Sequence, residues 1–140
     1  MTGVQTCALP ICILANDVAC KNVALDFRKQ PAERLLFPNI EPAVVPGTDM
    51  SNQQIVATIV HLHHRLFGQE REPAHPEIQR SFELFAGIVA DANAAGRFEP
   101  RESYFCGGGE KFKTEDPHYT VRAWRGVVTY LLRQHEFLYE

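Results

Sequence analysis

Apolar residues recur at helical spacing in three long segments, which predict three α-helices. The first covers residues 51–67. Its apolar row is Ile55, Ile59, Leu62 and Leu66 or Phe67. Ser51 and Gln54 have the spacing of a capping box at its start. Gly68 is a typical residue for the end of a helix, because glycine adopts the left-handed conformation without steric cost.

The second predicted helix begins at Pro76, which suits the first helical position, and ends at Gly96. The third begins near Pro117, with Asp116 as its N-cap. The apolar face of the second helix is Ile78, Phe82, Phe85, Val89 and Ala92, and that of the third is Val121, Trp124, Val127, Val128, Leu131 and Leu132, continued by Leu138 and Tyr139. Each face is wide enough to form part of a core.

The remaining segments show weaker patterns. Residues 12–50 alternate loosely and then contain Pro38, Pro42 and Pro46, which interrupt regular structure. Residues 97–116 form a long connector between the second and third helices. We therefore expect an all-α fold: a three-helix antiparallel bundle-like domain over residues 51–140, an irregular N-terminal arm over residues 12–50, and a long loop between the last two helices.

Composition and charge narrow the class of protein. Hydrophobic residues make up 45% and charged residues 22% of the 140-residue chain, values typical of a globular domain. The formal net charge of -3 argues against nucleic acid as a partner. No apolar run approaches the roughly 20 residues that span a membrane.

Histidines are the candidate ligands for a cofactor. His61 and His64 are three residues apart on the polar side of the first helix, and they could share a metal ion if a third ligand came from elsewhere. His63 and His135 fall in the apolar arcs of the first and third helices, so they could be the paired axial ligands of a non-covalent haem. The simpler interpretation, which we favour, is that His63 and His135 are each a buried or boundary histidine bonded to a backbone carbonyl or a carboxylate. No catalytic residue can be assigned, because no nucleophile has an identifiable base.

The first residues resemble a translated sequencing adapter. Thr2 to Ile11 read TGVQTCALPI, the translation of ACT GGA GTT CAG ACG TGT GCT CTT CCG ATC. We therefore exclude residues 1–11 from the fold and expect the chain to be a metagenomic fragment that lacks its native start. Cys7 then belongs to the adapter, and the codon of Cys12 includes the last base of the adapter. Cys20 and Cys106, about 86 residues apart, either form one long-range disulfide or are two unrelated buried thiols.

Residues 61–68 (HLHHRLFG) and 75–85 (HPEIQRSFELF) resemble segments of the YRRLLGR and PDPEEIERALELF type. The stretch from Ala123-Trp124 to Phe137-Leu138-Tyr139-Glu140 resembles the segment that closes the same modules. These are uncharacterised helical domains of large exported proteins of planctomycetes and myxobacteria, often encoded together with c-type cytochrome domains. The resemblance covers residues 51–140, except the 97–117 connector.

This resemblance implies a periplasmic or secreted setting, which would suit a disulfide between Cys20 and Cys106. It carries over no catalytic residue. We therefore expect a non-catalytic helical packing or interaction module of a larger exported protein, in a setting of cytochrome electron transfer, with neighbouring domains of the same chain as partners and no cofactor in this fragment. The alternatives are a metal- or haem-binding domain that uses the histidines, and part of an enzyme whose active site lies in the missing region.

Overall fold

The computed structural model describes residues 10–96 and 103–138, and within them the side chains of residues 14–96 and 103–134. Over this part of the chain there are four α-helices: α1 (Pro10–Arg28), α2 (Asp49–Phe67), α3 (Pro76–Ala94) and α4 (Thr120–Leu138). Two short strands, β1 (Tyr104–Phe105) and β2 (Lys113–Thr114), pair antiparallel. The expected predominantly helical fold is confirmed. Over the same residues, no helix combines the length and the apolar character that crossing a membrane requires.

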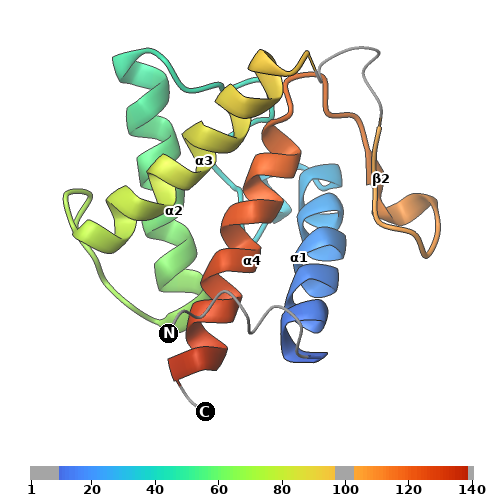
Figure 1. The fold of residues 1–140 in the computed structure, drawn as a ribbon, viewed down its shortest axis with the longest axis horizontal. Coiled ribbons are helices and arrows are strands. Elements are labelled where there is room, and N and C mark those ends of the chain that lie inside the picture. Colours follow the sequence, from blue (N-terminus) through green and yellow to red (C-terminus); the bar gives the residue numbers. More distant parts are fainter. Residues whose placement is uncertain (1–9, 97–102, 139–140) are drawn as a thin grey trace.

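Helix α4 is the centre of the fold. It packs most extensively against α1 on one side and α3 on the other, and α2 packs against α3 (Figure 1). Trp124 of α4 is fully buried, and its ring lies 4.3 Å from that of Phe85 and 5.3 Å from that of Phe37, measured between ring centroids. The first and last helices therefore share one hydrophobic core with the two helices between them.

Helix α1 corrects the expected irregular arm. Its buried residues Ala15, Ala19, Val23 and Phe27 are spaced by four positions, so they form one face of a helix. The interpretation of residues 12–50 as irregular was wrong for this part because it weighed the large apolar residues, whereas small alanines form half of the buried row. An alanine-rich face lets α1 approach α4 closely. The core is therefore built from four helices and not from three.

The segment after α1 is irregular, as expected, but a buried polar network holds it in place. It contains one short 3₁₀ turn, Pro31–Glu33. The Asp26 carboxylate accepts hydrogen bonds from the backbone N–H groups of residues 35–37, at 2.9 to 3.0 Å. The buried Arg34 guanidinium donates to the Phe27 and Ile40 carbonyl oxygens and to both carboxylate oxygens of Glu41. These groups hold a connector that has little regular structure of its own.

The helix ends follow the predicted signals with two shifts. Helix α2 starts earlier than expected, because Thr48 is the N-cap and forms the capping box with Ser51. Its end at Gly68, in the left-handed conformation with φ 67°, is as predicted. Helix α3 begins at Pro76, also as predicted. Helix α4 starts three residues after Pro117, and the Asp116 carboxylate accepts from the N–H groups of its first turn.

The described part of the long connector contains the small β-hairpin, which an all-α prediction did not include. The hairpin lies beside α1, with β2 at the outer edge of the fold (Figure 1). The first residues of the connector, 97–102, lie outside the described residues.

Candidate functional site

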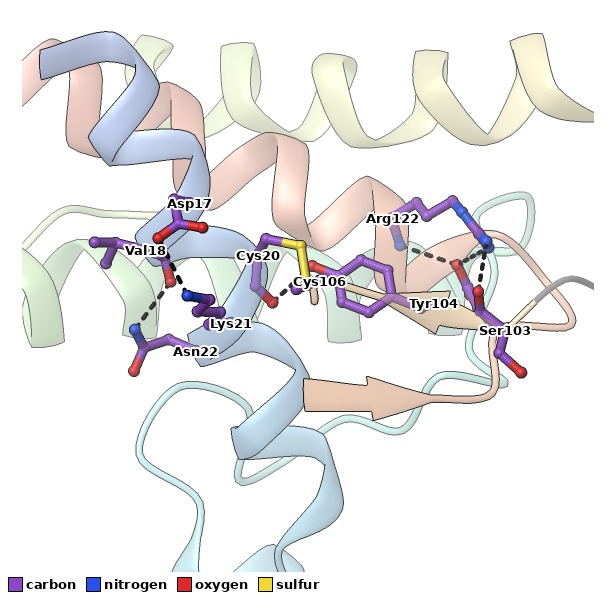
Figure 2. The surroundings of a disulfide bond; sticks show 10 residues. Asp17, Val18, Cys20, Lys21, Asn22, Ser103, Tyr104, Cys106 and Arg122 are labelled. Carbon is purple, nitrogen blue, oxygen red and sulfur yellow. Dashed lines mark hydrogen bonds and ion pairs between the residues drawn. A yellow bond between two sulfur atoms is a disulfide. The ribbon is translucent and has the colours of Figure 1, made fainter. Parts of the chain in front are cut away.

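The predicted disulfide joins α1 to the hairpin. Cys20 is bonded to Cys106 across 86 residues of sequence, with 5.8 Å between the two Cα atoms. Figure 2 shows the Tyr104 side chain beside this bond, with its hydroxyl donating to the Cys20 carbonyl oxygen at 2.8 Å. Tyr104 is buried, and this burial raises the pKa of its hydroxyl above the ordinary value. The alternative of two unrelated thiols is therefore wrong, and this region is a structural anchor.

His61 and His64 point to different partners. The His61 ring lies with Nε2 at 2.8 Å from the Leu35 carbonyl oxygen, and so connects α2 to the segment after α1. His64 Nε2 lies 3.2 Å from a carboxylate oxygen of Glu70. Among the side chains that the structure describes, no three His, Cys, Asp or Glu residues are grouped as metal ligands would be. The structure therefore does not bring together the shared metal site considered for this pair.

His63 occupies the buried position that its place in the apolar arc predicts. Its side chain is 3% exposed, and its ring packs edge-on against that of Phe67, with 6.2 Å between the ring centroids. Within the described residues neither ring nitrogen makes a hydrogen bond of normal geometry, so the carbonyl or carboxylate partner expected for His63 is not found. Desolvation is the main cause that lowers the pKa of His63 below 6.5, with a smaller opposing effect from the Gln69 side chain. Burial therefore favours the neutral form of the His63 imidazole.

A polar pocket of about 220 Å³ lies next to His63. It is formed where the end of α2, the loop after Gly68 and the first turn of α3 meet α4. Its lining residues besides His63 are Phe67, Gln69, Arg71, Glu77, Leu131 and Gln134. The pocket is smaller than the roughly 300 to 1,000 Å³ typical of sites for drug-sized ligands.

A larger and more apolar groove lies on the other side of α4. It has a volume of about 310 Å³ and is bounded by α1, the segment around Leu35, the end of α2 and α4. Val18 and Leu35, which line the groove, are 38% and 49% exposed, so apolar side chains form part of its open surface. Lys29 and Arg65 also line the groove, so its apolar surface carries cationic groups. We refer to this feature as the α1 groove.

No model of a protein family, no curated protein and no solved structure matches the chain. The resemblance to helical domains of exported proteins therefore remains a prediction. The haem hypothesis also remains one: His135 belongs to α4, but its side chain lies outside the described residues.

Sequence reasoning missed the α1 groove and most of the His63 pocket. Arg71 stands between Glu70 and Glu72 in the short loop between α2 and α3. The position of Arg71 could have predicted the pocket. Only eight residues separate the two helices, and so short a loop must lie close to the ends of both. The groove could not be anticipated, since α1 was taken to be irregular.

Proposed function

We propose that the chain is a non-catalytic helical interaction module of a larger exported protein, and that the α1 groove receives a neighbouring domain of the same polypeptide. The observation that carries the proposal is the α1 groove itself. Val18 and Leu35 are partly exposed around one concave apolar surface, and exposed apolar patches on folded domains commonly mark sites of protein–protein contact.

The disulfide supports the exported setting. Cys20 and Cys106 join two segments that are distant in sequence, and bonds of this kind persist in oxidising compartments such as the periplasm or the cell exterior. A setting near cytochrome domains follows only from the resemblance of residues 51–140, and it forms part of the same proposal.

Two experiments test the proposal. The first recovers the full-length gene and reads upstream of Cys12. An export signal and a preceding domain are expected. A native start within a few residues of Cys12, without an export signal, would contradict the proposal.

The second experiment compares hydroxyl-radical labelling of the isolated fragment with that of the recovered longer protein. Labelling of Val18 and Leu35 is expected to fall in the longer protein, because a docked domain excludes solvent from them. Met50, which is 79% exposed and does not line the groove, provides the internal reference. Unchanged labelling around the groove, or an equal fall at Met50, would argue against docking at this surface.

A further inference from the structure

The His63 pocket carries an inference that is independent of the interaction role. Its charged groups are of both signs: Arg71 and Glu77 line the same small volume, and both act electrostatically on His63. A simple anion would be attracted by Arg71 and repelled by Glu77, and a simple cation would meet the reverse. A ligand that fits both groups carries one positive and one negative charge.

Arg71 has hydrogen-bonding capacity to spare. Its Nε donates to the Gln69 side-chain oxygen at 3.3 Å, and its Nη1 lies 2.8 Å from Nε2 of His75. The other His75 nitrogen, Nδ1, accepts the N–H of Glu77 at 3.1 Å. Among the described residues, Nη2 of Arg71 makes no hydrogen bond and the guanidinium forms no ion pair.

Glu77 can accept a further donor. One of its carboxylate oxygens pairs with Arg80 Nη1 at 2.6 Å, and this leaves the other oxygen for a second hydrogen bond. The rest of the pocket combines apolar surface from Phe67 and Leu131 with the side-chain amides of Gln69 and Gln134. His63 adds a buried ring whose nitrogens make no hydrogen bond of normal geometry among the described residues, which is the kind of group that a polar ligand or an ordered water satisfies.

We propose that this pocket binds a small zwitterionic amino acid, with its carboxylate on Arg71 and its ammonium group on Glu77. The side chain of the ligand lies against Phe67 and Leu131. When the ligand draws Arg71 away from Gln69, the Gln69 amide is released to complete a hydrogen bond with His63. The volume of about 220 Å³ restricts the ligand to a small molecule of this class.

The test uses the whole chain and a matched set of probes: L-alanine, propionate, which carries only the carboxylate, and ethylamine, which carries only the ammonium group. Binding is followed by ¹H–¹⁵N NMR at constant ionic strength. L-alanine is expected to bind with a Kd of about 1 mM, as suits so small a ligand, and to shift the amides of residues 68–77 and the Gln134 side chain. Propionate and ethylamine are expected to bind at least tenfold more weakly.

Two variants locate the binding. Arg71→Gln removes the partner of the carboxylate and is expected to weaken L-alanine binding at least tenfold. Arg65→Gln removes an arginine that lines the α1 groove instead, and it is expected to leave the Kd unchanged. The proposal is overturned if L-alanine shifts none of these resonances at 20 mM, if propionate binds equally well, or if the two variants behave alike.

Discussion

Removal of the disulfide between Cys20 and Cys106 should cost a large share of the stability of this protein. The bond closes a loop of 86 residues. In the chain-entropy model, closing a loop of this length lowers the conformational entropy of the unfolded chain, and this stabilises the fold by about 4.5 kcal/mol at 25 °C. A domain of this size has a total stability of roughly 5 to 15 kcal/mol. The protein without this bond is therefore expected to have a much smaller free energy of unfolding.

The assay is urea unfolding followed by circular dichroism on the oxidised protein and on the variant Cys20→Ala/Cys106→Ala. We expect the free energy of unfolding of the variant to be lower by about 3 to 4.5 kcal/mol. Strain in the native state offsets part of the entropic stabilisation by the bond, whereas the two alanines also remove some packing. The corresponding fall in Tm is about 10 to 15 °C. Addition of a reductant should destabilise the wild-type protein by a similar amount and leave the variant unchanged, which serves as the control.

A loss below about 1 kcal/mol would refute this reasoning. It would mean that the hairpin is already held to α1 in the unfolded ensemble, or that other contacts replace the bond. Such contacts include the Tyr104 hydroxyl on the Cys20 carbonyl and the Arg28 guanidinium on the Glu110 carbonyl.

Three further predictions concern single residues. Asp26→Ala leaves three backbone N–H groups without their acceptor, and a loss of about 2 to 4 kcal/mol is expected in urea unfolding; a loss under 1 kcal/mol would show that water replaces the carboxylate. His63→Leu removes a buried ring that makes no hydrogen bond of normal geometry among the described residues, and it should stabilise the fold by about 1 kcal/mol at pH 8. Because burial lowers the pKa of His63, the unfolded chain takes up a proton at this histidine before the folded protein does as the pH falls below 6.5. The free energy of unfolding of the wild type should therefore fall relative to that of His63→Leu between pH 6.5 and the lowered pKa. Parallel pH profiles of the two proteins would contradict this. Gly87→Ala, at a helical position with open space around it, should stabilise the fold by about 0.8 kcal/mol. Gly126→Ala brings a methyl group to 2.6 Å from the end of the Ile88 side chain, so it should stabilise the fold less or destabilise it. Equal changes in Tm for the two variants would refute this contrast.

The parts of the fold that the sequence predicted correctly depend on large apolar residues and on local capping chemistry. Helix α3 begins at Pro76 and α2 ends at Gly68, because both residues act through their own backbone geometry. Helix α1 was missed because alanine contributes little to a hydrophobic pattern, although Ala15 and Ala19 are almost fully buried. Their burial depends on the close approach of α4, which is a tertiary effect.

The candidate sites show the same division. The burial of His63 followed from its angle on a helix, and this prediction is confirmed. The separation of His61 and His64 did not follow, because it depends on a carbonyl of the segment after α1 and on a carboxylate in the next loop. Arg71 and Glu77 line one pocket because of the way in which α2 and α3 meet. Contacts between elements of this kind cannot be predicted from the periodicity of one segment.

The packing of the first helix against the last one has a consequence for the order of folding. About 90 residues separate the end of α1 at Arg28 from the start of α4 at Thr120. At a synthesis rate of about 5 to 20 residues per second, α1 waits roughly 5 to 20 seconds for its main partner. During that interval Cys106 is also absent for most of the time, so the bond that ties the hairpin to α1 forms only after most of the chain has been made.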